Sequence, residues 1–424
     1  HAGFWTPIVI SLAAFAVAWR LHAWARSPAA SEADAIQIDG DWLSFPALLW
    51  SAAWWCLGWW MELARISPTG GWLAHDFLGL AGTSALILLP ISLKWHWKRL
   101  AGLCGLLLPL VALTAFVDYV ANRSLLIDHG WLGLSLSLAA CLGLLRLTEN
   151  LFQTHRQQML HLVNFWVWLG VVSLISRHAF LYLGEPGSAW RWLGWVLPLA
   201  AWLLWQTRET PARLWPFSVD HRLYRFTATL PPLLIQLVWL VLANLHSSGD
   251  AAPLPFLPLL NPLDLALVLT LFTAWQWGRQ LEAQNPEEYG WQAFHEPLKL
   301  ALFAGAFLTY TCAVLRGVSH FGLVPWEADA LMASMTAQAS LSIAWALLAL
   351  GLMISGHRHE RRPVWISGAV LIALVVAKLF FIELSNRGGL ERIVSFLGVG
   401  VLLLVVGYFA PLPPRPEDSK EAEA

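Results

Sequence analysis

The sequence predicts an all-α fold, a polytopic transmembrane helix bundle with short loops. Hydrophobic residues make up 58% of the 424 residues, and only 12% are Asp, Glu, Lys or Arg. A soluble domain carries roughly 25% charged residues, so this chain lacks the polar groups needed to cover a water-exposed surface. Apolar runs of about 17 to 22 residues recur along the whole chain, and runs of this length are typical of membrane-spanning helices.

Charged residues, prolines and glycines divide these runs into about thirteen expected spans. The spans centre near residues 12, 55, 82, 109, 138, 172, 197, 237, 269, 306, 346, 374 and 401. Each is expected to be a helix, because an isolated segment in lipid must satisfy its backbone hydrogen bonds internally. We therefore predict a single transmembrane helical domain over residues 1–410. Residues 411–424 are proline-rich and then acidic, which predicts a disordered tail.

The basic residues predict the orientation of the bundle. When the loops are assigned alternately to the two sides of the membrane, 18 of the 26 Lys and Arg residues fall on one side and 7 on the other. Loops rich in Lys and Arg stay in the cytoplasm. The distribution therefore places the C-terminus, residues 411–424, in the cytoplasm.

Charge and motifs exclude several classes of function. The formal net charge of −1 gives no electrostatic reason to expect a nucleic-acid partner. The four cysteines lie inside apolar runs without a C-x-x-C pair, and no residue spacing indicates a metal site. The sequence contains no Walker, G-x-S-x-G or H-E-x-x-H motif. We expect no metal and no cofactor, and we interpret most of the 28 tryptophans as anchors at the membrane–water interface.

Charges in or beside the last spans are the strongest functional signal, because each charge is costly in lipid. Arg316 and His320 are spaced i, i+4 and share one helix face, and Lys378 lies well inside its expected span. Together with polar residues that follow Lys378, they form the predicted substrate-binding set: Arg316, His320, Lys378, Glu383, Asn386 and Arg392. The alternative is a set of ion pairs that lock helices together.

A second group of charges lies at the same predicted outer face and includes acids suited to general-base chemistry. Asp118 and Asp128 flank one expected outer loop, and Glu327 lies in another. If the protein is an enzyme, Asp118, His320 and Glu383 are the candidate catalytic residues. The sequence itself does not decide whether it is one.

Longer phrases in the second half of the chain resemble one family. They are PLLNPLDLAL at residues 258–267, RGVSHFGLVPWEADAL from Arg316, QASLSIAWALLALGLM, and KLFFIELSNRGGLERIVSFLGVGVLLLVVGYFAPLPP from Lys378. These phrases are similar to bacterial predicted multi-pass membrane proteins called domain of unknown function 2339. The resemblance implies a bacterial inner-membrane location. It also implies that this chain, which starts at His1, is the C-terminal membrane part of a longer protein. The family usually shows two adjacent histidines after the arginine, whereas this chain has Ser319 in the first of these places.

Three functions are compatible with these observations. The leading hypothesis is an envelope protein that binds or moves a lipid-linked or anionic envelope substrate through an outward-facing polar cavity. In this hypothesis Arg316, Lys378 and Arg392 bind anionic groups, and His320 and Glu383 handle protons. The alternatives are a membrane transferase that acts on a lipid-linked sugar or acyl donor at the outer face, and a non-catalytic envelope scaffold. Membrane lipids are expected partners in all three cases.

Overall fold

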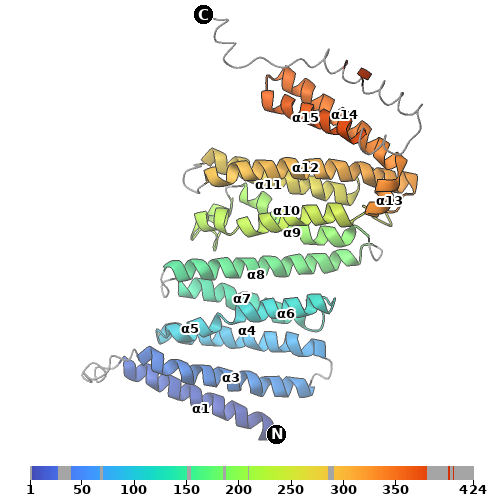
Figure 1. Cartoon of the computed structure of the whole chain (residues 1–424). Helices are drawn as coiled ribbons and strands as arrows, with labels where there is room; N and C mark the ends of the chain where they lie inside the picture. Colours follow the sequence, from blue (N-terminus) through green and yellow to red (C-terminus); the bar gives the residue numbers. More distant parts are fainter. Residues whose placement is uncertain are drawn as a thin grey trace, which may run out of the picture. The chain divides into compact units, whose positions relative to one another are not determined.

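The computed structural model is built from helices throughout the residues that it describes, namely 2–26, 40–66, 70–149, 154–184, 188–208, 210–284, 291–379, 400, 401 and 404. The elements are α1 (Ala2–Ala25), α3 (Gly40–Ile66), α4 (Gly70–Lys94), α5 (Lys98–Cys104), α6 (Leu107–Val120), α7 (Gly130–Thr148), α8 (Thr154–Leu181), α9 (Trp190–Gln206), the 3₁₀ turn η1 (Thr210–Arg213), the π-helical turn η2 (Leu223–Thr227), α10 (Leu230–His246), α11 (Pro262–Gln284), α12 (Trp291–Gly322), α13 (Ala328–Ala333), α14 (Met335–Arg358) and α15 (Arg362–Lys378). Figure 1 shows their order along the chain.

The expected spans agree with these helices in position but not in number. Every expected centre from residue 12 to residue 374 lies within a helix. Eight helical segments in the described part of the chain are long and apolar enough to cross a membrane, so the count of about thirteen is not confirmed. Helices α9 and α15 have 17 residues each, about 25 Å of helix, which is short of the roughly 30 Å hydrocarbon core. The segment around the last expected centre, near residue 401, lies almost entirely outside the described residues.

The chain divides into two compact units. The first comprises His1–Leu183, Arg191–Gln236 and Gln276–Trp291, and the second comprises Gly184–Trp190, Leu237–Trp275 and Gln292–Ala424.

Small residues allow close helix packing in the first unit. A Cβ atom at Gly82 of α4 would lie 2.9 Å from the backbone nitrogen of Ser137 on α7, so the two backbones are almost in contact. Such contacts are typical of membrane helices. Small residues there let the backbones approach closely, and van der Waals packing rather than the hydrophobic effect drives helix association. Buried Leu108, Leu144 and Val171 extend this core to α6, α7 and α8.

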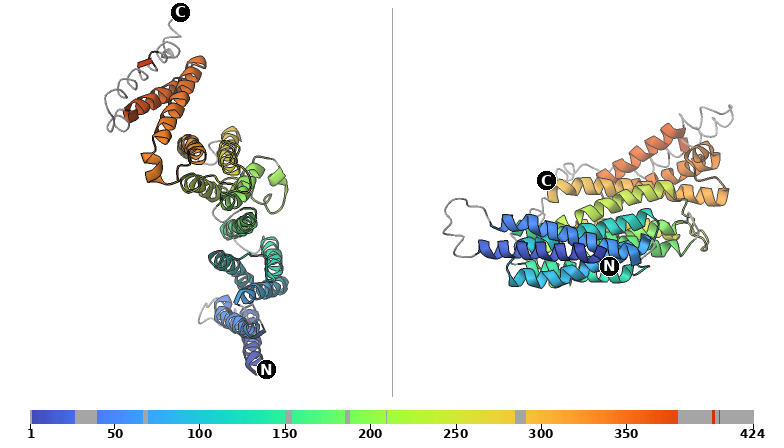
Figure 2. Two further views of the ribbon diagram at one scale, coloured as in Figure 1. Left: turned by 90° about the vertical axis from the view of Figure 1, so that its right-hand side faces the viewer. Right: turned by 90° about the horizontal axis from the view of Figure 1, so that it is seen from below.

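Helices α1 and α3 form a separate pair within the first unit and lie side by side in all views (Figures 1 and 2). Hydroxyl groups hold the pair together. The Ser11 Oγ donates to the Ser51 carbonyl at 2.8 Å, and the Ser51 Oγ donates to the Ser11 carbonyl at 2.9 Å. These reciprocal bonds fix the register of the two helices at mid-length.

In the second unit, α14 and α15 form a similar close pair. A Cβ atom at Gly368 of α15 would lie 2.6 Å from the Met353 side chain of α14, and Met353 is buried in the core of this unit. Two hydrogen bonds tie α14 to α12: Tyr310 donates to the Ala344 carbonyl at 2.8 Å, and the Trp345 indole donates to the Thr311 hydroxyl at 3.1 Å.

Candidate functional site

Arg316 is the centre of a buried polar network in the second unit. Its side chain on α12 is fully buried, and its Nη2 lies 2.8 Å from the Asp264 Oδ1 on α11. The Nε atom donates to the same oxygen at 3.1 Å, and Nη2 donates to the Asn244 Oδ1 on α10 at 3.1 Å. One guanidinium therefore joins three helices, and its charge is compensated within the protein.

The rest of this network is built locally by the start of α11. The Asn261 side chain accepts the backbone N–H of Asp264 at 2.9 Å, which caps the helix. The Asn261 amide and the Leu259 backbone N–H both donate to the Asp264 Oδ2. Asn244 in turn donates to the Thr309 hydroxyl on α12 at 3.1 Å. Asp264 is therefore oriented toward Arg316 by its own helix cap.

One nitrogen of the guanidinium has no hydrogen-bond partner among the described residues. The Arg316 Nη1 is buried and donates to none of them. The Trp326 ring lies 5.9 Å from the Arg316 Cζ, at the outer limit of a cation–π interaction.

The segment between α10 and α11 covers this network. Gly249 has a φ of +78°, and a Cβ atom there would lie 2.7 Å from the Arg316 Cδ. The Phe256 ring stacks on His320 with centroids 3.9 Å apart, and the His320 Nε2 lies 3.1 Å from the Ser248 carbonyl. A carbonyl only accepts hydrogen bonds, so this Nε2 carries a proton.

The other members of the predicted binding set are placed differently. The Lys378 Nζ on α15 donates to the Gln338 carbonyl at 2.9 Å and to the Ser342 hydroxyl at 2.7 Å, both on α14. The structure thus joins Arg316 and His320 in one neighbourhood and holds Lys378 on another helix pair. Glu383, Asn386 and Arg392 lie outside the described residues.

Ser319, which stands where the family usually has a histidine, has a local structural role here. Its hydroxyl donates to the Val324 carbonyl at 2.7 Å, just beyond the end of α12. Glu327, one of the candidate bases, is exposed and occupies the position before α13.

Asp118 forms a second buried charge cluster, in the first unit. Its Oδ2 lies 2.6 Å from the His75 Nε2 on α4, and its Oδ1 lies 3.2 Å from the Arg123 Nη2. The other ring nitrogen of His75 lies 3.3 Å from the Asp128 carbonyl. The Oδ2 atom and both imidazole nitrogens are therefore occupied by protein groups, whereas Oδ1 is buried beside Arg123 without a hydrogen bond among the described residues. This arrangement suits the tethering of α4 to α6 better than the activation of a substrate.

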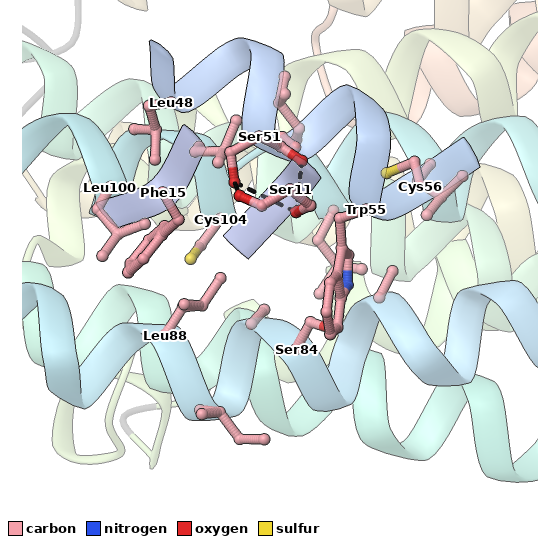
Figure 3. A pocket seen from close by; sticks show the side chains of 18 of the residues that line it. Ser11, Phe15, Leu48, Ser51, Trp55, Cys56, Ser84, Leu88, Leu100 and Cys104 are labelled. Carbon is pink, nitrogen blue, oxygen red and sulfur yellow. Dashed lines mark hydrogen bonds between the residues drawn. The ribbon is translucent and has the colours of Figure 1, made fainter. Parts of the chain in front are cut away.

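A cavity of about 480 Å³ lies between the α1–α3 pair and helices α4, α5 and α6 of the first unit (Figure 3). Leucines, alanines and aromatic rings dominate its lining, including Phe15, Leu48, Leu88 and Leu107. Its polar side chains are few. Ser11 and Ser51 donate to each other's backbone carbonyls, and the Ser84 hydroxyl accepts the Trp55 indole N–H at 3.2 Å.

A break between α5 and α6 forms part of the cavity wall. Helix α5 ends at Cys104 and α6 begins at Leu107, with Gly105 and Leu106 between them. Cys104, Leu106 and Leu107 all line the cavity. The sequence predicts one span centred near residue 109 and does not predict this site. Gly102, Gly105 and Pro109 were the available signal, since glycine and proline mark helix interruptions.

The described residues contain no group of three His, Cys, Asp or Glu side chains that could hold a metal ion. Comparison with curated proteins and comparison with solved structures each gave no match. The family model described as predicted membrane protein (DUF2339) matches residues 2–413. This match covers nearly the whole chain and confirms the resemblance seen in its second half. The protein is a multi-pass helical membrane protein and a member of the DUF2339 family.

Proposed function

We propose that this protein binds the hydrocarbon chain of an envelope lipid in the cavity between the α1–α3 pair and helices α4 to α6. The observation that carries the proposal is the combination of the size and lining of this cavity. Its volume of about 480 Å³ falls within the roughly 300–1,000 Å³ of ligand pockets in general. Its three serines have their hydroxyls engaged with helix backbones or with Trp55, so the surface presented to a ligand is apolar.

Within a lipid bilayer, a hydrocarbon chain is recognised by how well its shape fits the cavity and not by its hydrophobicity. A hydrocarbon chain gains nothing from leaving lipid for an equally apolar wall, because lipid tails are as apolar as leucine. Net binding must come from dispersion contacts with a preformed surface. Phe15, Trp55 and Phe77 supply rigid rings on three different helices for such contacts.

The polar network around Arg316 favours the helix-lock interpretation over anion binding. Its guanidinium is fully buried and paired with Asp264. A ligand phosphate that took the place of that carboxylate would break a buried ion pair, which costs about 3–5 kcal/mol. A role in lipid binding is therefore better supported for the apolar cavity. We further propose, from the resemblance to bacterial members of the family, that the membrane is the bacterial inner membrane and, from the charge distribution, that the C-terminus faces the cytoplasm.

Two cavity-filling variants test the proposal. Ala52→Phe and Ala81→Phe add a ring at positions that line the cavity, and Ala53→Phe adds the same ring at the exposed neighbouring position. The readout is labelling of the purified protein by a phospholipid with a photoreactive acyl chain, mapped to residues by mass spectrometry. Thermal unfolding in detergent checks that all three variants remain folded.

We expect adducts on cavity-lining residues such as Cys104 in the wild-type protein. Ala52→Phe and Ala81→Phe should remove most of this labelling, whereas Ala53→Phe should leave it unchanged. Labelling of the cavity residues that stays the same in folded Ala52→Phe and Ala81→Phe proteins would refute hydrocarbon binding there.

A further inference from the structure

A second cavity, of about 220 Å³, lies in the first unit beside the connection from α9 to α10, and its lining is cationic. It is bordered by Arg208, Arg213, His221 and Arg225, together with Thr207 and Gln280. None of these residues lines the cavity between the α1–α3 pair and helices α4 to α6, called the hydrocarbon cavity below. Either site can therefore exist without the other. We propose that this second cavity binds a phosphate-bearing anion.

The chemistry of the lining matches a phosphate group. Three guanidinium groups border one small space, and the planar N–H donors of a guanidinium match phosphate oxygens in pairs. The volume of about 220 Å³ is below the range of drug-sized ligand pockets, which suits a small polar group better than an extended molecule.

Arg225 is the fixed element of this site. It is 6% exposed, although it borders the cavity. Its Nη2 donates to the Gln280 Oε1 at 3.0 Å, and its Nη1 lies 3.4 Å from the His221 Nε2. The Gln280 amide donates to the Thr207 carbonyl, which ties α11 to the end of α9. The guanidinium is thus oriented before any ligand arrives.

Aromatic packing holds the connecting segment that carries these residues. Phe217 contacts the rings of Trp205 and Tyr224, with centroids 4.8 Å and 4.9 Å apart. The Trp215 indole donates to Glu149 at 2.8 Å, and the Trp277 indole donates to the Arg225 carbonyl at 3.1 Å. A segment fixed in this way loses little conformational entropy when it binds a ligand.

The predicted orientation suggests two sources for the phosphate. Residues 206–228 belong to the basic loops that the charge distribution assigns to the cytoplasmic side, and their mix of basic and aromatic residues predicts a position at the lipid headgroups, where basic residues meet anionic lipids. A phosphate group can reach the cavity there from a lipid headgroup or from a soluble cytoplasmic compound. The recognition chemistry is the same in both cases, so the source is decided by experiment.

The test uses the 424-residue chain in a zwitterionic detergent with two probes. Inorganic phosphate is titrated by isothermal calorimetry, and phosphatidylglycerol binding is measured by native mass spectrometry with phosphatidylcholine as the reference lipid. Arg208→Gln and Arg213→Gln remove exposed lining charges. Arg222→Gln is the matched control, because Arg222 is exposed in the same segment and does not line the cavity.

We expect wild-type protein to bind at least one probe, and each lining variant to weaken that binding by about tenfold or more, as for the loss of a charge-assisted hydrogen bond. Arg222→Gln should change the affinity by much less. Binding of inorganic phosphate that competes with phosphatidylglycerol identifies a site open to soluble phosphates, whereas binding of phosphatidylglycerol alone identifies a headgroup site. If neither probe binds, or if the lining variants lose no more affinity than Arg222→Gln, the proposal is wrong.

Discussion

Replacing Asp264 by Asn should destabilise the protein far more than replacing an exposed acid. At an effective dielectric constant of about 20, unit charges 2.8 Å apart attract each other by about 6 kcal/mol. Desolvation of both groups offsets much of this attraction, but loss of one partner leaves the fully buried Arg316 uncompensated. The amide introduced by Asp264→Asn would also have to turn its NH₂ group toward donors, because the two Asp264 oxygens face only donors. We expect a loss of about 3–5 kcal/mol in the free energy of unfolding.

Equilibrium unfolding by sodium dodecyl sulfate in mixed micelles, followed by tryptophan fluorescence, measures this quantity. Asp329→Asn is the control, since Asp329 is an exposed acid in the same unit. Arg316→Gln and the double variant Asp264→Asn/Arg316→Gln complete a double-mutant cycle. The double variant should lose about 2 kcal/mol less than the sum of the two single variants, because it removes both charges together. The reasoning is refuted if Asp264→Asn costs no more than Asp329→Asn, or if the two single losses simply add.

Three further predictions follow, two from packing and one from charge. Gly82→Ala should lose about 1–3 kcal/mol, because its Cβ would lie 2.9 Å from the Ser137 nitrogen. Gly170→Ala, in the middle of α8 with no atom within 4 Å of its Cβ, should gain about 0.5–1 kcal/mol in the same unfolding assay. A green fluorescent protein fused after Ala424 should fluoresce and an alkaline phosphatase fused there should be inactive, if the C-terminus is cytoplasmic. The opposite pattern would reverse the predicted topology.

The helices could be predicted from the sequence because apolar run length is a local property. A run of about twenty apolar residues between charged breaks has one stable form in lipid, whatever surrounds it. The number of membrane spans was less predictable, because it depends on helices of marginal length such as the 17-residue α9 and α15. The break between α5 and α6 was missed for a related reason. Gly105 and Leu106 lie between the two helices, and the apolar composition continues through them.

The candidate sites were predictable only in part. The cost of charge in lipid singles out Arg316 in the sequence, and the structure places this residue in a buried pair with Asp264. Its partners could not be read from the sequence, because Asp264 and Asn244 lie 52 and 72 residues away and several other acids were equally plausible. The hydrocarbon cavity could not be predicted from the sequence. A cavity is the space left when helices such as α3 and α5 meet imperfectly, and composition does not record how they meet.

The side chains that line the two cavities are relevant to the choice between binding and catalysis as the function of these sites. A transferase needs a nucleophile or base that can reach its substrate within hydrogen-bond distance. In the hydrocarbon cavity the hydroxyls of Ser11 and Ser51 donate to helix backbone carbonyls, and the hydroxyl of Ser84 accepts the Trp55 indole N–H. Asp118, the strongest candidate base in the same unit, has both oxygens paired with His75 and Arg123. The lining of the two proposed sites is mainly hydrocarbon in one cavity, and guanidinium groups with His221 in the other, which is why we propose a lipid tail for the first and a phosphate for the second.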